Sequence, residues 1–297
     1  MMSNLSFEQL SDLRHGRFGI TDVPCPLCGP DRRSPGNQRR KVLRLWCDDP
    51  NFITYRCARC EIDGYAHDGS TRAYDPAAME RVWAKARECR RLEDVESLKK
   101  SRWLWSCRLP IEGTLAETYI RDCRGYRGRL PPTLGFLPAR GDYHPAMIAA
   151  FGMARETLPG EIVIDDAAVR DVHLTKLKPD GSGKAGTGDD KITVGTSSLG
   201  FPIVLAPVND GLGLVITEGI EDALSIHEAT GLGAWAAGNA SRMPALAAVV
   251  PDYVECISIF ADPDDKGITN AQKLATALQR SDRDVRLIIP SSEGVAA

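Results

Sequence analysis

Short apolar runs alternate with helix-like segments along the last third of the chain. Apolar runs begin near residues 213, 233, 255 and 284, and helical spacing begins near residues 220, 242 and 268. Short β-rich runs that each lead into a helix are typical of βαβ units in a parallel sheet. The pattern therefore predicts an alternating α/β unit with a parallel sheet over residues 211–290.

The preceding residues carry more mixed patterns. Residues 42–46 and 52–56 alternate between apolar and polar positions, as strands do. Residues 75–103 are rich in good helix formers and predict one long or two short helices. Strand-like pieces at 172–177 and 202–205 then stand among Pro-rich turns. We therefore expect an α/β protein, α+β when the front part is included.

Acidic residues follow two of the predicted strands. Glu218 comes directly after one apolar run, and Asp262 and Asp264 come directly after another. Ligands of parallel sheets bind beyond the carboxyl ends of the strands, so we expect these three side chains to meet at one edge. Hard oxygen ligands without nearby Cys or His favour Mg²⁺ or Mn²⁺ over zinc. Each acid taken alone could instead cap a helix or face solvent.

The cysteines predict a second metal centre. Four of the nine cysteines form two Cys-x-x-Cys pairs that are separated by 28 residues: Cys25, Cys28, Cys57 and Cys60. This spacing is typical of a closed, structural zinc site in a zinc ribbon, here over residues 20–70, with Gly29 or Gly64 helping the chain to turn. Two alternatives are free or redox-active cysteines, and a ligand set in which Cys47 or His67 replaces one of the four.

Charge is unevenly distributed along the chain, although the net charge is only −3. Residues 1–130 hold 24 Lys or Arg against 18 Asp or Glu, and the remaining residues hold 13 against 22. Such a split suits a front half that contacts a polyanion and a back half that collects cations. No apolar run approaches the roughly 20 residues of a membrane span, and the first ten residues are not signal-like, so we expect a cytoplasmic protein without a membrane partner.

Basic side chains are the candidates for nucleic-acid contact. In the predicted ribbon they are interleaved with Trp46, Phe52 and Tyr55, and comprise Arg39, Arg40, Lys41, Arg44, Arg56 and Arg59. Bases can stack on such aromatic rings while the cations hold phosphates. The alternative is that the aromatic residues fill a small core, which is at least as good an interpretation for Trp46 and Tyr55.

Three residues of the middle region are further candidates for holding a template or a triphosphate: His173, Lys176 and Lys191. Each could also be an ordinary strand or loop residue. The pair Gly183-Lys184 lies nearby, but Lys178 and Ala185 occupy positions where a phosphate-binding loop needs Gly and Ser or Thr. We therefore reject a phosphate-loop motor in this region.

The acidic motifs resemble a known domain. Thr217-Glu218-Gly219 after one strand, and Asp262-Pro263-Asp264 after a second, with Gly267 three residues later, resemble the Toprim domain of DnaG-type primases, topoisomerases and related nucleases. The resemblance covers about residues 212–290. It implies that Glu218 is the catalytic acid and that Asp262 and Asp264 bind metal. Asp222 falls where Toprim primases often carry a further acid, and it is added to the expected magnesium ligands.

The order of the segments extends the resemblance to the whole chain. A zinc ribbon (20–70), a helical linker (71–110), a primase-core subdomain (111–210) and a Rossmann-like Toprim domain (211–290) resemble the DnaG-type primases, especially the shorter phage and plasmid proteins. This implies synthesis of short RNA primers on single-stranded DNA from ribonucleoside triphosphates, with structural Zn²⁺, catalytic Mg²⁺ or Mn²⁺, and a replicative helicase acting in trans. The alternatives are a Toprim nuclease that uses the same carboxylates, and a nucleic-acid-binding protein with a vestigial Toprim domain.

Overall fold

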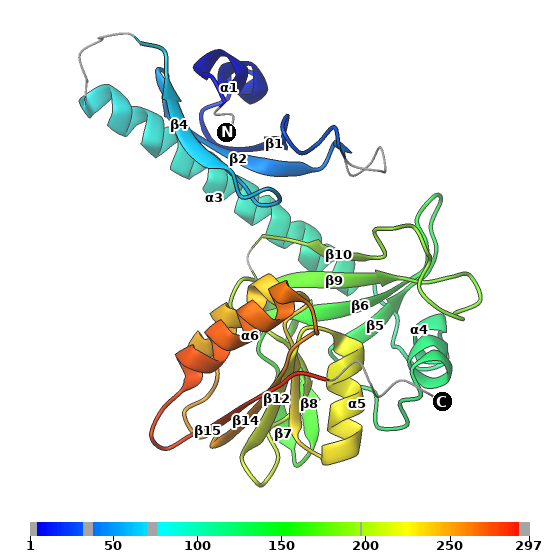
Figure 1. Cartoon of the computed structure of the whole chain (residues 1–297). Helices are drawn as coiled ribbons and strands as arrows, with labels where there is room; N and C mark the ends of the chain where they lie inside the picture. Colours follow the sequence, from blue (N-terminus) through cyan, green and yellow to red (C-terminus); the bar gives the residue numbers. More distant parts are fainter. Residues whose placement is uncertain (1–4, 32–37, 70–75, 197, 291–297) are drawn as a thin grey trace. The chain divides into compact units, whose positions relative to one another are not determined.

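The computed structural model describes residues 5–31, 38–69, 76–196 and 198–290 (Figure 1). The chain divides into two compact units, Met1–Glu93 and Asp94–Ala297, and each is considered by itself below. Residues 71–75, the start of the expected linker, lie outside the described residues. Within the described part of the chain, no helix combines the length and the apolar character that a membrane crossing requires.

The first unit is built on a four-stranded antiparallel sheet. Its strands are β1 (Gly19–Pro24), β2 (Lys41–Asp49), β3 (Phe52–Cys57) and β4 (Asp63–His67), in that order, preceded by helix α1 (Phe7–Arg14). Side chains alternate across a strand, so Leu43, Leu45 and Cys47 enter the core while Arg44 and Trp46 lie on the other face. The strands predicted at 42–46 and 52–56 are confirmed.

Helix α3 (Pro76–Ser106) is a single long helix, one of the two forms expected for this segment. Its final turns belong to the second unit, where Trp105 is fully buried together with Ile148 and Val172. The hydroxyl of Ser101 donates hydrogen bonds to the carbonyl oxygens of Ser97 and Val194. The end of α3 is thus fixed to one face of a sheet in the second unit.

That sheet is antiparallel and lies in the part of the second unit that precedes the acidic motifs. Its strands run in the order β10 (Lys191–Val194), β9 (Asp171–Lys176), β6 (Ala146–Phe151) and β5 (Leu134–Leu137). A hairpin of β7 (Arg155–Leu158) and β8 (Glu161–Val163) and a 3-10 turn η2 (Asp166–Ala168) lie between β6 and β9 in the sequence. A short helix α4 (Leu115–Thr118) continues into the π-helical turn η1 (Tyr119–Cys123).

The second sheet of this unit has five strands. Their order is β11 (Ile203–Ala206), β13 (Gly233–Ala236), β12 (Gly213–Thr217), β14 (Cys256–Phe260) and β15 (Asp284–Ile288), and all but β11 are parallel. Val215 packs with α5 (Ile220–Thr230) on one face, whereas Leu214 and Ile216 pack with α6 (Asp265–Leu278) on the other. The predicted α/β class and the predicted parallel sheet are confirmed, whereas the spatial order of the strands was not predicted.

One predicted helix of this domain has a different form in the structure. The segment expected to form an α-helix near residue 242 is the 3-10 helix η3 (Ala240–Ala248). Pro244 lies inside it and has no backbone N–H for the i→i−4 bond, which favours a short, tighter helix. Strands β1, β4, β5, β6 and β10 and the hairpin β7–β8 were not predicted.

The strand order creates a binding crevice. From central strand β12 the chain moves to β13 on one side and then crosses to β14 on the other. Ligands of open α/β sheets bind where the strand order reverses in this way, beyond the carboxyl ends of the strands. The crevice is therefore expected between the ends of β12 and β14.

Candidate active site and metal centre

The acidic residues lie at this crevice. Glu218 follows β12 directly, while Asp262 and Asp264 come just after β14. Ile216 is paired with Ile259, and continuing this parallel register by two residues sets Glu218 opposite Ala261. Neighbouring strands are about 4.8 Å apart, so the Glu218 backbone lies next to the residue that precedes Asp262. We call Glu218, Asp222, Asp262 and Asp264 the acidic edge.

Glycines allow the backbone to pack closely around the acidic edge. A Cβ on Gly219 would come 2.7 Å from the Oδ2 of Asp222, and one on Gly267 would come 2.6 Å from the carbonyl oxygen of Asp262. Gly238 has a φ of +83° and donates its N–H to the carbonyl oxygen of Glu218 at 2.9 Å. These positions need Gly because a side chain would displace the acidic edge or strain the backbone.

The helix-cap alternative applies to one of the acids. Asp264 is the N-cap of α6, and its Oδ1 accepts a hydrogen bond from the Gly267 N–H at 2.6 Å. One carboxylate oxygen of an N-cap aspartate remains available, so capping and metal binding are compatible at this position.

The carboxylates affect each other's protonation. Burial raises the pKa of Glu218 above its ordinary value, and the charges of Asp262 and Asp264 raise it further. Burial also raises the pKa of Asp262, followed by the charges of Asp222 and Asp264. A divalent cation would relieve this repulsion, and the donors are the hard oxygens that Mg²⁺ and Mn²⁺ prefer. Among the described residues, however, only four cysteines, considered below, bring three or more ligand atoms of His, Cys, Asp or Glu within 4.8 Å of one another.

A cavity of about 350 Å³ opens beside the acidic edge. Asp222 and Asp262 line it together with the hydroxyl-bearing Thr217 and Ser225 and the apolar Phe260. The cavity therefore offers an aqueous space in which a ligand can reach two of the acids.

A cationic cluster lies next to the acidic edge and centres on a buried acid that we had not singled out. Glu221, in the first turn of α5, is 8% exposed. Its Oε1 lies 3.2 Å from the Nζ of Lys184, and its Oε2 lies 3.2 Å from the Nζ of Lys191. The Tyr119 hydroxyl donates to Oε1 at 2.8 Å, and the Arg124 guanidinium donates to the Tyr119 oxygen at 3.0 Å. We call these five residues the Glu221 cluster.

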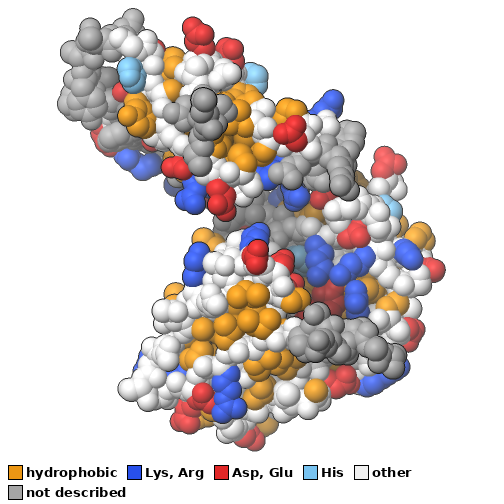
Figure 2. All heavy atoms as spheres, in the orientation of Figure 1, with side chains coloured by type: hydrophobic (Ala, Val, Ile, Leu, Met, Phe, Trp, Pro, Cys, Tyr) orange, Lys and Arg blue, Asp and Glu red, His pale blue; other side chains and the backbone are white. Residues whose placement is uncertain are grey.

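The charges of the Glu221 cluster are unbalanced in favour of cations. Although burial acts to raise the pKa of Glu221, Lys191 and Lys184 lower it to about 2, so the carboxylate stays charged. Lys191 also acts against the raised pKa of Glu218 and of Asp262, so its charge is felt at the acidic edge. Figure 2 shows Lys and Arg side chains gathered around acidic ones on the face of the second unit that carries β9 and β10.

The other two candidates of the middle region differ in exposure. His173 on β9 is only 4% exposed, with its ring edge-on to Phe151 at 6.2 Å between ring centres. Burial and the charge of Lys191 lower its pKa to about 4, so it is neutral at neutral pH. It therefore offers neither charge nor surface to a phosphate in this conformation. Lys176, the last residue of β9, is half-buried and remains a candidate.

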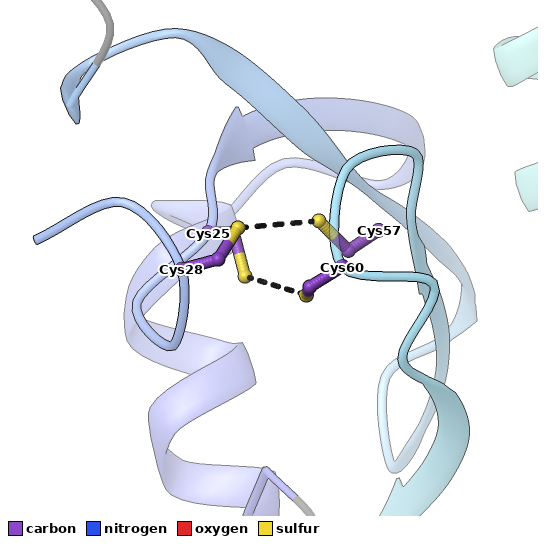
Figure 3. A group of neighbouring side chains, drawn as sticks. All are labelled: Cys25, Cys28, Cys57 and Cys60. Atoms are coloured by element: carbon purple, nitrogen blue, oxygen red, sulfur yellow. Dashed lines mark hydrogen bonds between the residues drawn. The ribbon is translucent and has the colours of Figure 1, made fainter. Parts of the chain in front are cut away.

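The predicted cysteine centre is compact (Figure 3). Cys25 and Cys28 follow β1, Cys57 ends β3, and Cys60 lies in the next turn; the four Sγ atoms lie within 4.8 Å of one another. The Sγ atoms of Cys25 and Cys60 are 3.9 Å apart, and those of Cys28 and Cys57 are 3.8 Å apart. Four sulfurs around a tetrahedral zinc at about 2.3 Å would be about 3.8 Å apart. The set can therefore hold a metal such as zinc.

The ligand alternatives do not join this group. Cys47 is buried in the core of the first unit, and the Nδ1 of His67 accepts a hydrogen bond from Gly69. Gly29 closes the first knuckle, where a Cβ would come 2.5 Å from the Cys25 carbonyl oxygen. The expectation that Gly64 helps the second turn is wrong: Gly64 lies in β4 against the Tyr55 hydroxyl, and Glu61, with a φ of +59°, makes the turn.

The thiols have contrasting affinities for protons. Burial raises the pKa of Cys25 to about 12. Burial acts in the same direction on Cys57, but the backbone amides of Cys60 and Arg59 stabilise its thiolate and lower its pKa to about 7. Cys57 is therefore deprotonated more easily than Cys25, and a bound cation would be needed to ionise Cys25 at neutral pH.

The outer face of the first unit's sheet carries aromatic and basic side chains. Tyr55 lies in the core at 1% exposure, as one alternative held, while Trp46 is half-buried and Phe52 is exposed. Phe52 stacks on Tyr65 at 5.6 Å, and Tyr65 was not singled out from the sequence. Four of the six cations are exposed on this sheet and on the residues that precede β2: Arg39, Arg40, Lys41 and Arg56. Arg44, also exposed, forms a bidentate pair with Asp22 at 2.8 and 2.9 Å, and Arg59 is half-buried.

Two domain families match the chain. Residues 213–294 match the Toprim domain, and residues 95–202 match a domain of unknown function, DUF7146. The carboxyl-terminal parallel sheet with the acidic edge is thus a Toprim domain, and this prediction is confirmed. No curated protein matches the chain.

Among solved structures, the chain is similar to the primase fragment of the bacteriophage T7 primase-helicase protein. The sequences are 14% identical, and the match covers 90% of this chain and 88% of that chain with a TM-score of 0.35. Residue roles are not carried over from a likeness of this degree.

Proposed function

We propose that the chain is a primase-like nucleotidyltransferase that joins ribonucleotides into short RNA primers on single-stranded DNA. The observation that carries the proposal is the acidic edge of a Toprim domain with two lysines, Lys184 and Lys191, held beside it. Carboxylates that bind divalent cations and ammonium groups that meet phosphates are the two requirements of nucleotidyl transfer.

The residues of the acidic edge would share the chemical work. Asp262, Asp264 and Asp222 would hold Mg²⁺ or Mn²⁺, which supplies neutralisation of the triphosphate and activation of the primer 3′ hydroxyl. Glu218 would receive the proton of that hydroxyl, because a raised pKa makes its carboxylate a stronger base than an ordinary glutamate. The new bond joins the 3′ oxygen to the α-phosphorus of the nucleotide, and pyrophosphate leaves.

Basic residues near the acidic edge would bind the phosphates. Lys184 and Lys191 are 29% and 38% exposed, so a triphosphate can reach both ammonium groups. Lys176 could add a contact from the end of β9. His173 would support this site from within the core without touching the phosphates.

The first unit would hold the template. A structural zinc bound by the four cysteines would fix the knuckles at the ends of β1 and β3. Bases would stack on Phe52, Tyr65 and the exposed part of Trp46, and phosphates would contact the cations around them: Arg39, Arg40, Lys41, Arg44, Arg56 and Arg59. A replicative helicase acting in trans would complete the set of partners.

The test uses labelled ribonucleoside triphosphates and, separately, a labelled single-stranded template, each with the full chain and Mg²⁺ or Mn²⁺. Short labelled products that are lost in Glu218→Gln and in Asp262→Asn support the proposal. Asp252→Asn is the matched control, because Asp252 precedes β14 at its opposite end and pairs with Arg280. Degradation of the template that is lost in the same two variants would make the protein a Toprim nuclease. Template binding without any reaction would leave a vestigial Toprim domain.

A further inference from the structure

A buried carboxylate at position 221 is energetically unfavourable, which suggests that Glu221 serves a function. It buries a carboxylate next to an edge that already carries Glu218, Asp222, Asp262 and Asp264. Apolar residues of similar volume in place of all members of a buried ion pair are often neutral or stabilising, so stability alone does not account for such a pair. The helix neighbours Ile220, Ala223 and Leu224 are apolar and buried, so the position is suited to an apolar residue.

Glu221 uses both carboxylate oxygens to fix two cations from one segment. Lys184 lies in the excursion between β9 and β10, and Lys191 is the first residue of β10, where that excursion ends. Each ammonium group lies 3.2 Å from a different oxygen. The excursion is itself ordered: Leu177 bridges to Lys184, and Ala185 donates its N–H to the carbonyl oxygen of Lys176 at 3.0 Å. The lysines are therefore restrained at both the backbone and the ammonium group.

A third segment completes the restraint on Glu221. Tyr119 donates to Oε1, the same oxygen that faces Lys184, and Arg124 donates in turn to the Tyr119 oxygen. Three segments thus meet at one carboxylate: η1, the β9–β10 excursion and α5. The carboxylate carries one negative charge against the two ammonium groups, so the pair of lysines retains an excess positive charge for an anionic ligand.

We propose that Glu221 is a positioning residue that holds Lys184 and Lys191 at the acidic edge, so that the phosphates of a ribonucleoside triphosphate meet two preplaced cations. The proposal deepens the proposed function and rests on it for the identity of the ligand. Preplacement lowers the cost of ordering two long, flexible side chains when the nucleotide binds.

The test is the equilibrium dissociation constant of a ribonucleoside triphosphate with Mg²⁺, measured by titration calorimetry on the full chain without template. Glu221→Gln keeps the shape and an acceptor for Tyr119 but loses both ion pairs, and it should weaken binding about tenfold. Glu228→Gln is the matched control, because it removes an exposed acid from the same helix two turns away, and it should stay within about twofold of the wild type.

Glu221→Asp separates position from charge. Glu221→Asp keeps the negative charge but shortens the side chain. If Glu221 acts by positioning the lysines, nucleotide binding in Glu221→Asp should be as weak as in Glu221→Gln. This test does not depend on the Gln variant folding. The double variant Lys184→Met with Glu221→Gln should bind the nucleotide only slightly less tightly than the weaker-binding single variant, because the two residues act as a unit. An unchanged dissociation constant in Glu221→Asp, or lowered melting temperature alone in Glu221→Gln, would overturn the proposal.

This readout separates the inference from the proposed function. If the wild type binds nucleotide but makes no primers, and Glu221→Asp binds it weakly, the inference stands without the primase. If the wild type makes primers and Glu221→Asp binds nucleotide normally, the primase stands and the inference fails. A wild type that does not bind the nucleotide would also overturn the inference.

Discussion

Glu218 and Asp262 hold their charge at a cost to the fold. Burial and neighbouring carboxylates raise the pKa of both residues, which means that the folded state binds their protons more tightly than the unfolded state does. Their contribution to stability is therefore most favourable at acidic pH and is lost as the pH rises through the raised pKa. A site that is unfavourable without a cation is suited to binding one.

This leads to a prediction for stability. In EDTA at pH 7, Glu218→Gln should unfold at a temperature about 2 °C higher than the wild type. The reason is that removing the repulsion between half-exposed carboxylates should raise the free energy of unfolding by about 0.5–1 kcal/mol. Lowering the pH through the carboxyl range should close the gap, because the wild-type side chain then becomes neutral too. Thermal melts at several pH values measure this; a variant that is less stable than the wild type at pH 7 would contradict it.

At the scale of single residues, the sequence predicts the acids and one cationic neighbour, Lys191, but not Lys184 or the buried Glu221 that pairs with both lysines. Glu218, Asp262 and Asp264 could be found because each follows an apolar run, and strand ends share an edge. Tyr119 and Glu221 are 102 positions apart in the sequence, so their contact depends on the tertiary fold. One signal was available: Glu221 is a charged residue among apolar positions of α5.

At the scale of elements, the sheet of the first unit has two different faces. The inner face carries Leu43, Leu45 and Tyr55, and the outer face carries Trp46, Phe52 and Tyr65. Two of these outer aromatic side chains are well exposed, Phe52 at 40% and Tyr65 at 67%. Aromatic rings at a protein surface among cations are suited to stack on bases.

The outer face is predicted to bind single-stranded DNA. Phe52→Ala and Tyr65→Ala should each weaken binding about tenfold, since a stacked base contributes roughly 1–3 kcal/mol. Fluorescence anisotropy with a labelled oligonucleotide at fixed salt measures the effect. Tyr253→Ala, which removes an exposed ring from the second unit, is the control. Equal affinities in all three variants would mean that DNA does not bind this face.

In this unit the two central strands and the cysteine site could be predicted, from the alternation of apolar residues and from the Cys-x-x-Cys spacing. The two edge strands could not be predicted. β1 and β4 each pair with only one neighbour and lack a continuous apolar run, so their strand form depends on pairing with β2 and β3. The same holds for the hairpin β7–β8, whose first strand is exposed throughout. Pro244 was visible in the sequence and would have identified η3 as an interrupted helix.

At the scale of the whole molecule, the two candidate metal centres belong to different compact units. The cysteine centre lies in Met1–Glu93, and the acidic edge lies in Asp94–Ala297. Each unit has its own hydrophobic core. Residues 1–93 hold 16 Lys or Arg against 13 Asp or Glu, and residues 94–297 hold 21 against 27, which agrees with a division between polyanion and cation binding.

Removal of the cysteine-bound metal should therefore affect one unit. A thiol-reactive zinc probe should release about one zinc per chain, and single-stranded DNA binding should fall, because the knuckles lose the ion that holds them. Nucleotide binding with Mg²⁺ should persist. Cys60→Ser should behave likewise, and Cys107→Ser, an exposed cysteine outside the centre, should not. Loss of nucleotide binding on zinc release would contradict the separation.

The acidic edge is proposed to be a divalent-cation site. The most direct test is the binding of Mn²⁺ to the full chain, detected by electron paramagnetic resonance, in the wild type, Asp262→Asn and Asp252→Asn. We predict that Mn²⁺ binding falls at least about tenfold in Asp262→Asn and is unchanged in Asp252→Asn, which loses the same charge at the other end of β14. Equal Mn²⁺ binding in all three proteins would contradict the assignment of the acidic edge.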